Sequence, residues 1–162
     1  MSESLIINSE ATIDEQYQLL VKQVKSLLQK ENNLITNLSN FTAALKQTFS
    51  KISWVGFYLF DGNKLYLGPF QGKVACTEIQ IGSGVCGTSA SERKSIIVDD
   101  VDKFPGHIAC DADSRSEIVV PIFKDEKLFG VLDLDSTDYK SFDDTDKKYL
   151  EELVNFLSKE II

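Results

Sequence analysis

The sequence predicts an α+β domain in which helices from both ends of the chain cover one face of a mainly antiparallel, six-stranded sheet. Apolar residues recur at helical spacing near both ends of the 162 residues, and short β-branched and aromatic runs lie between them. Polar turns join several of these runs, which favours hairpins and therefore antiparallel pairing. With no linker-like stretch visible, we expect a single domain over residues 1–162.

Residues from about 13 to 49 are expected to form an antiparallel helix pair. Thr12 and Glu15 match a capping box, which marks a helix start. A polar break at residues 31–33 separates two apolar stripes. The stripes consist of Tyr17, Leu20, Val21, Val24, Leu27 and Leu28, and then of Leu34, Leu38, Phe41, Leu45 and Phe49.

Residues from about 52 to 136 are expected to hold the sheet and the loops of a functional site. A hairpin signal at residues 61–64 separates the first two strands. The strands are expected at 52–60, 65–67, 74–81, 95–98, 117–123 and 128–135. A closing helix at about 144–160 is capped by Asp143 or Asp144 and carries one apolar face.

The charge balance bears on possible partners. Seventeen Lys and Arg against 25 Asp and Glu give a net charge of −8, which disfavours nucleic acid and anionic membranes as partners. No apolar run approaches the ~18 residues that span a bilayer, and the N-terminal residues lack the pattern of a signal peptide. Three Cys, an odd number, favour a reducing compartment. We therefore expect a cytoplasmic protein.

The three cysteines admit three interpretations. Cys76 is expected on a strand, Cys86 at a loop–helix junction and Cys110 in the long polar loop 99–116. They could be inert buried side chains, or they could bind zinc together with His107, the single His. They could also be redox groups, in which one thiolate attacks and a second thiol resolves the product.

Cys110 is the best candidate for the attacking thiol, because irregular loops host reactive groups more often than strand interiors do. Asp111 and Asp113 follow it closely, and neighbouring anions raise a thiol pKa. The attack therefore needs a compensating cation, or a substrate that brings the charge.

Three acidic residues form a second candidate group. Asp133 and Asp135 alternate around Leu134 and therefore share one face of a strand, and Glu117 lies on the preceding strand. Asp133 and Asp135 could lie at the strand end in solvent. They could also line an acidic pocket that binds an ammonium group or holds a proton on a carboxyl with a raised pKa.

Trp54 and Tyr58 share a strand face, with Gly56 between them. They could be ordinary core, or the missing side chain at Gly56 could leave a gap lined by two rings that takes a small apolar or cationic group. The glycine-rich stretch 82–90 lacks the ending of a phosphate-binding loop and is expected to be a turn into a short helix.

Four segments together resemble one family: WVGFY at 54–58, GSGVCG at 82–87, IACDADSRSEIVVPI at 108–122 and GVLDLDS at 130–136. They resemble a GAF domain and, more narrowly, the free methionine-(R)-sulfoxide reductases. This resemblance implies thiol-dependent reduction of free L-methionine-(R)-sulfoxide to methionine through a Cys sulfenic acid and an intramolecular disulfide. It also implies recycling by thioredoxin, no bound cofactor or metal, and, as in many relatives, a homodimer.

The resemblance also implies roles for individual residues. Cys110 is then the attacking thiol, Cys76 the resolving thiol and Cys86 a further participant. Polar substrate contacts fall on Glu117, Asp133 and Asp135, and the walls around the substrate methyl group fall on Trp54 and Tyr58.

Sulfoxide reduction needs a thiol and a proton donor close together, because a thiolate must attack sulfur while an acid such as Glu117 protonates the departing oxygen. Arg115 is a further candidate to steady a carboxylate or the thiolate. The main alternative is a non-catalytic GAF module that binds a small metabolite for signalling, since the domain type alone does not fix a function.

Overall fold

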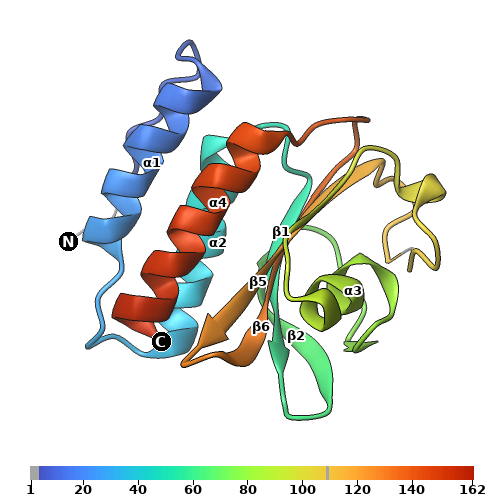
Figure 1. Ribbon diagram of the computed structural model, residues 1–162. Helices are drawn as coiled ribbons and strands as arrows, with labels where there is room; N and C mark the ends of the chain where they lie inside the picture. Colours follow the sequence, from blue (N-terminus) through green and yellow to red (C-terminus); the bar gives the residue numbers. More distant parts are fainter. Residues whose placement is uncertain (1–3, 109) are drawn as a thin grey trace.

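The computed structural model describes residues 4–108 and 110–162 (Figure 1). Two helices open the fold, α1 (Ile13–Leu27) and α2 (Leu34–Thr48). The strands are β1 (Trp54–Phe60), β2 (Lys64–Gln71), β3 (Glu78–Gln80), β4 (Ile96–Val98), β5 (Ser116–Lys124) and β6 (Lys127–Ser136). Helix α3 (Gly84–Glu92) precedes β4, and α4 (Asp144–Phe156) runs into a π-helical turn at Leu157–Ile161.

The six strands form one antiparallel sheet in the order β3-β2-β1-β6-β5-β4. The two central strands place Trp54 opposite Asp135 and Gly56 opposite Asp133. Strand β5 then places Glu117 opposite Asp135. This register confirms the predicted fold class and brings the acidic and aromatic candidates together at the middle of the sheet.

One face of the sheet packs against α2 and α4, and α1 packs on the outer side of these two helices (Figure 1). The strands contribute alternate residues to this core, because successive side chains point to opposite faces. The buried strand residues on this side are Val55, Phe57, Ile118, Val120, Ile122, Leu132 and Leu134. The prediction that the terminal helices share one face is confirmed. Within the part of the chain that is described, no helix is long and apolar enough to cross a membrane.

The opposite face carries α3 and the irregular segments around it (Figure 1). Its smaller apolar cluster contains Trp54 and Tyr58 from β1, Val119 from β5, Val131 from β6 and Cys86 from α3. Gly84 begins α3 with φ +61°, a conformation that Gly adopts without strain. Both faces are therefore covered, but by different kinds of layer.

The third strand is shorter than the sequence pattern predicts. Only Glu78–Gln80 pairs with β2, so the placement of Cys76 on a strand was wrong. The segment before β3 is held by side chains of β1: Trp54 Nε1 donates to the Lys73 carbonyl (3.0 Å) and the Tyr58 hydroxyl to the Cys76 carbonyl (3.0 Å). These side-chain contacts replace the strand ladder there.

The expected gap at Gly56 is also absent. A Cβ atom built on this glycine would lie 2.5 Å from Trp54 Cη2 and 2.5 Å from Phe70 Cβ. The indole and the Phe70 ring stack over this position, with ring centroids 5.4 Å apart. Gly56 therefore makes room for neighbouring aromatic side chains and does not itself open a pocket.

Candidate active site

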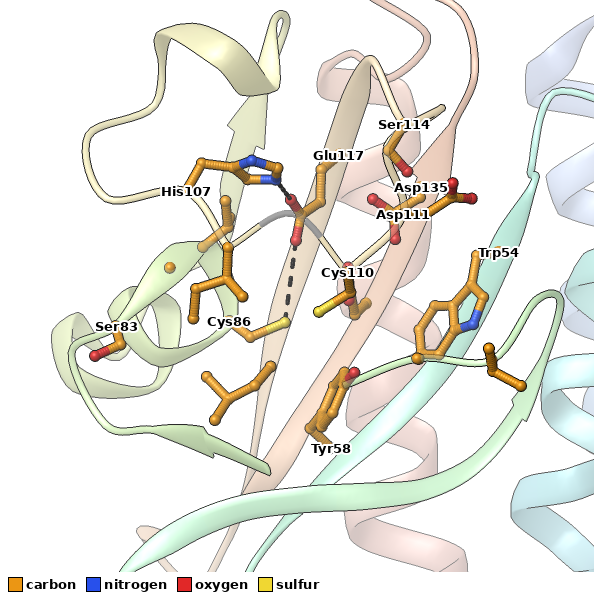
Figure 2. A pocket seen from close by; sticks show the side chains of 17 residues that line it. Trp54, Tyr58, Ser83, Cys86, His107, Cys110, Asp111, Ser114, Glu117 and Asp135 are labelled. Carbon is orange, nitrogen blue, oxygen red and sulfur yellow. Dashed lines mark hydrogen bonds and ion pairs between the residues drawn. The ribbon is translucent and has the colours of Figure 1, made fainter. Parts of the chain in front are cut away.

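A pocket opens on the α3 face of the sheet, between the central strands and the loops that carry the cysteines (Figure 2). Seven of the eight predicted site residues line it: Trp54, Tyr58, Cys86, Cys110, Glu117, Asp133 and Asp135. The eighth, Cys76, lies beside the pocket in a disulfide with Cys110. Elements distant in the sequence thus converge on one cavity.

The carboxyl groups lie at the base of this pocket. Glu117 is 5% exposed and Asp133 is 6% exposed, so the solvent interpretation is wrong for Asp133. Asp133 Oδ1 has no hydrogen-bond partner among the described residues. Asp135, at the end of β6, is only partly buried. A buried carboxylate without a partner is costly, so this site suits a cationic group or a proton.

Burial changes the protonation of these acids. Desolvation raises the pKa of Glu117 well above its usual range, and the charges of Asp133 and Asp135 add to the effect. Desolvation also raises the pKa of Asp133 to about 6 and that of Asp135 well above normal. Burial therefore favours the protonated form of Glu117, and a protonated carboxyl can donate its proton.

Cys86 faces these acids from α3. Its thiol is buried, and its Sγ donates to Glu117 Oε1 at 4.0 Å (Figure 2). Desolvation, with the nearby Asp133 and Glu117 carboxyls, raises the pKa of the Cys86 thiol. A thiol held neutral is a poor nucleophile, so this environment does not favour Cys86 as the attacking group.

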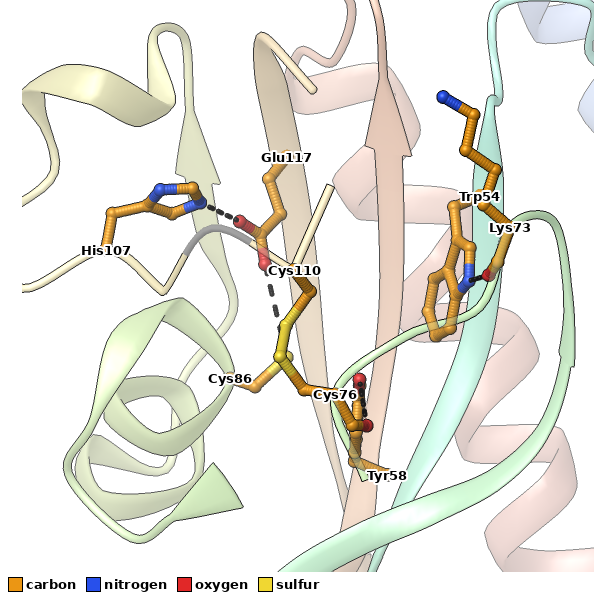
Figure 3. Close-up of a disulfide and its surroundings, with 8 residues drawn as sticks. All are labelled: Trp54, Tyr58, Lys73, Cys76, Cys86, His107, Cys110 and Glu117. Atoms are coloured by element: carbon orange, nitrogen blue, oxygen red, sulfur yellow. Dashed lines mark hydrogen bonds and ion pairs between the residues drawn. A yellow bond between two sulfur atoms is a disulfide. The ribbon is translucent and has the colours of Figure 1, made fainter. Parts of the chain in front are cut away.

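Cys76 and Cys110 form a disulfide, with Cα atoms 5.5 Å apart and a sequence separation of 34 (Figure 3). Cys110 is exposed, as the loop position predicted. The inert interpretation is therefore wrong for this pair. While the disulfide is closed, neither sulfur is free to join Cys86 and His107 as a zinc ligand.

The two aromatic candidates have a double role. The rings of Trp54 and Tyr58 are 6.0 Å apart and nearly parallel, and both line the pocket. Their polar atoms bind the carbonyls of Lys73 and Cys76 (Figure 3). They therefore form a wall and also fix the segment that presents Cys76.

Sequence reasoning weighed zinc-ligand and catalytic roles for His107 and favoured a structural or solvated residue, but the structure brings it to the acids. Its Nε2 lies 3.7 Å from Glu117 Oε2, and desolvation lowers its pKa, so the ring is neutral at pH 7. A lone His in a loop gave no signal of this contact. Arg115 was assigned to the site wrongly: it donates to the carbonyls of Ala112 and Ser114 and does not line the described pocket.

Two kinds of cation could occupy the acidic base. Three potential metal-binding atoms lie within 4.8 Å of one another, one each from Cys86, Glu117 and Asp133. They are close enough to share a metal ion. The same carboxyls suit a substrate ammonium, with the aromatic wall beside them. An accessible redox pair, a protonated acid and an acidic recess are the groups that thiol-dependent sulfoxide reduction needs.

Comparison with known proteins agrees with this chemistry. The GAF domain family pattern matches residues 37–160. A free methionine-R-sulfoxide reductase of Saccharomyces cerevisiae is 45% identical over 164 residues, covering 96% of this chain and 89% of that protein.

Two solved structures have the same fold. One is the Neisseria meningitidis free methionine-R-sulfoxide reductase in complex with its substrate, at 43% identity and TM-score 0.93, covering 98% of this chain and 95% of that one. The other is fRMsr of Staphylococcus aureus in reduced form, at 54% identity and TM-score 0.86, covering 90% and 95%. The chain belongs to the GAF-domain family of free methionine-R-sulfoxide reductases.

Proposed function

We propose that this protein reduces free L-methionine-(R)-sulfoxide to L-methionine, with Cys110 as the attacking thiol and Cys76 as the resolving thiol. The observation that carries the proposal is the Cys76–Cys110 disulfide at a pocket lined by Glu117, a buried carboxyl whose pKa is raised by desolvation. Family membership supports it, and the solved Neisseria meningitidis relative is described with its substrate bound.

The first step transfers the sulfoxide oxygen. Glu117 donates a proton to that oxygen, the Cys110 thiolate attacks the substrate sulfur, and the sulfur–oxygen bond breaks. The sulfoxide is reduced to the thioether of methionine, and Cys110 is oxidised to a sulfenic acid. Glu117 then regains its proton from solvent; His107 is neutral with its Nε2 3.7 Å from the Glu117 carboxyl, so it could relay this proton only after taking one up itself.

The second step closes the disulfide. The Cys76 thiol attacks the Cys110 sulfenic acid, the new sulfur–sulfur bond forms, and water leaves. An external dithiol then supplies two electrons and two protons to regenerate both thiols. We propose thioredoxin as this reductant, because the Cys110 side of the disulfide is exposed to a protein partner. Cys86 is a secondary participant at most, since its thiol is held neutral.

Substrate recognition falls on the remaining site residues. Asp133 and Asp135 bind the ammonium of the free amino acid, and Trp54 and Tyr58 surround the methyl group on sulfur. The proposal includes one GAF-like domain over residues 1–162 that acts in the cytoplasm, and a homodimer as its assembly. It includes no bound cofactor or metal.

The test compares free methionine sulfoxide, resolved into its two sulfur epimers, with N-acetylmethionine sulfoxide. Acetylation removes the ammonium, and losing a charge-assisted contact lowers kcat/KM by about ten- to 150-fold. We expect turnover of the free R epimer with a thioredoxin system and little of the acetylated compound. Equal kcat/KM for both would contradict the recognition scheme. No turnover of either epimer would favour a metabolite-binding GAF module.

A further inference from the structure

An exposed lysine joins the two segments that carry the redox cysteines. Lys73 Nζ lies 2.6 Å from Asp113 Oδ2 and 3.6 Å from Asp111 Oδ1. Lys73 is three residues before Cys76, and the two aspartates follow Cys110 by one and three residues. One ammonium thus bridges the flank of one cysteine to the flank of the other.

Both ends of this bridge are held by other contacts. The carbonyl of Lys73 accepts from Trp54 Nε1, so the base of the lysine is fixed to β1 (Figure 3). On the other side, the Asp113 amide donates to Asp111 Oδ1 (2.9 Å) and the Ser114 amide to the Asp111 carbonyl (3.2 Å). The lysine therefore links an anchored strand end to a compact turn.

The bridge matters most when the disulfide is open. Apart from the disulfide, the polar contacts recorded between the described residues of segments 72–77 and 110–114 all come from Lys73. Reduction removes the covalent tie, and the ion pair is then what holds Cys110 near Cys76. The same ammonium also offsets the two carboxylates beside Cys110.

We propose that Lys73 is a positioning residue for the redox pair: by pairing with Asp113 and Asp111 it holds the Cys110 loop against the Cys76 segment and so favours disulfide closure. Its use in turnover rests on the proposed function, in which the Cys76 thiol attacks the Cys110 sulfenic acid and water leaves. The clamp itself acts on any formation of this disulfide. The coupling is reciprocal. If the ion pair makes disulfide formation more favourable, the disulfide makes formation of the ion pair more favourable by the same free energy.

The sign of the effect distinguishes a clamp from simple charge compensation. If Lys73 only compensated the aspartates, replacing it would raise the thiol pKa of Cys110, disfavour the thiolate and make the disulfide harder to reduce. If it clamps the segments, its loss makes the disulfide easier to reduce. The raised pKa of Lys73 and the lowered pKa of Asp113, caused first by their mutual hydrogen bond, agree with a formed pair.

The experiment equilibrates the full chain with mixtures of reduced and oxidised dithiothreitol and measures the fraction of Cys76–Cys110 disulfide. For K73Q and D113N we expect the equilibrium constant for disulfide formation to fall about two- to fivefold, as exposed ion pairs contribute modestly. K73R should stay close to the parent. High salt should lower the equilibrium constant of the parent protein towards that of K73Q and leave the constant of K73Q unchanged, because salt screens exposed ion pairs.

The matched control is K64Q. Lys64 also makes an exposed 2.6 Å ion pair, with Glu78 two residues after Cys76, but this pair lies within the β2–β3 hairpin and does not reach the Cys110 segment. It should leave the equilibrium unchanged. An unchanged or larger constant in K73Q, or an equal fall in K64Q, would overturn the proposal. Because this readout needs no sulfoxide, it stays interpretable even if methionine sulfoxide is not turned over.

Discussion

The two faces of the central sheet are built from the same strands but serve different purposes. On β6, Leu132 and Leu134 point into the helix-covered core, while Asp133 and Asp135 point into the pocket. On β1, Val55 and Phe57 face the helices, and Trp54 and Tyr58 face the cysteines. Because neighbours on a strand alternate, a rigid apolar core lies directly behind each group of the site.

Two buried acids, one on each side of the sheet, show how the two faces differ. Asp146, on α4, accepts from Lys51 Nζ at 2.7 and 2.9 Å and from the Tyr17 hydroxyl at 2.7 Å. Asp133, on the pocket face, has one oxygen without any partner among the described residues. The first acid is fully satisfied and stabilises the fold. The second is unsatisfied among the described residues, which agrees with the ammonium contact proposed for it.

The largest expected effect is at the cysteines of the pocket face. Cys110→Ser should abolish even the first turnover, because a serine hydroxyl is a far poorer nucleophile than a thiolate. Cys76→Ser should release one methionine per site and then stall, and Cys86→Ser should be milder. Single-turnover methionine release without reductant measures all three. A full burst from Cys110→Ser with none from Cys86→Ser would reverse the assignment.

On the opposite face, a truncation should cost stability and leave the chemistry intact. Leu134→Ala removes a fully buried side chain from the helix-covered core, which typically costs about 2–5 kcal/mol. Its neighbours Asp133 and Asp135 keep their place in the pocket. Denaturant unfolding measures the loss, and kcat/KM per folded molecule should stay near the parent value. A large fall in kcat/KM at unchanged stability would show that the faces are not separable.

The two buried acids should respond to neutralisation with opposite signs. Asp146→Asn breaks a hydrogen-bonded charge pair and should cost about 1–3 kcal/mol. Asp133 has a folded pKa of about 6, above its value of 3.8 in a free chain, so it lowers stability as pH rises from about 4 to 6. Asp133→Asn should therefore raise stability at pH 7 by up to about 3 kcal/mol.

Thermal unfolding of Asp146→Asn and Asp133→Asn at pH 4 and pH 7 checks both predictions. The gain from Asp133→Asn should fall to about 0.5 kcal/mol at pH 4, where the folded carboxyl is protonated and the unfolded one is about half ionised. A gain that is the same at both pH values would mean that packing, not ionisation, explains it.

The smallest of these effects is on substrate recognition. Asp133→Asn and Asp135→Asn keep the shape of the side chain and remove its charge, so each should lower kcat/KM about tenfold, equivalent to about 1.4 kcal/mol. Steady-state kinetics with free methionine sulfoxide measures the change. If either variant unfolds while its folded fraction keeps full activity, that residue is structural.

The division of the sheet into a helix-covered face and a pocket face could largely be predicted from the sequence. The alternation of Asp133 and Asp135 around Leu134 placed both acids on one face, because the period of a strand is fixed at two. The helices followed from their apolar stripes and caps. The pairing of Cys76 with Cys110 came from the family resemblance, since spacing alone left zinc, redox and inert interpretations open.

The remaining features depend on contacts between distant segments. Residues 74–77 carry a strand-like pattern, yet hydrogen bonds from Trp54 and Tyr58 hold this segment out of the sheet. The sequence argument required a cation beside Cys110, but nothing in the composition singles out Lys73, which lies 37 residues before Cys110. Such partners become visible only once the chain is folded, because local propensity does not encode them.

The position of the disulfide outside the strands has a consequence for the durability of the molecule. Cys76 and Cys110 lie in irregular segments and have a sequence separation of 34. Forming the bond therefore does not disturb the hydrogen bonds of the sheet, but it closes a loop in the unfolded chain. In the chain-entropy description, a loop of this length restricts the unfolded ensemble by about 4 kcal/mol. The oxidised protein is then the more heat-resistant form, and each reduction in the proposed cycle returns the chain to a less stable form.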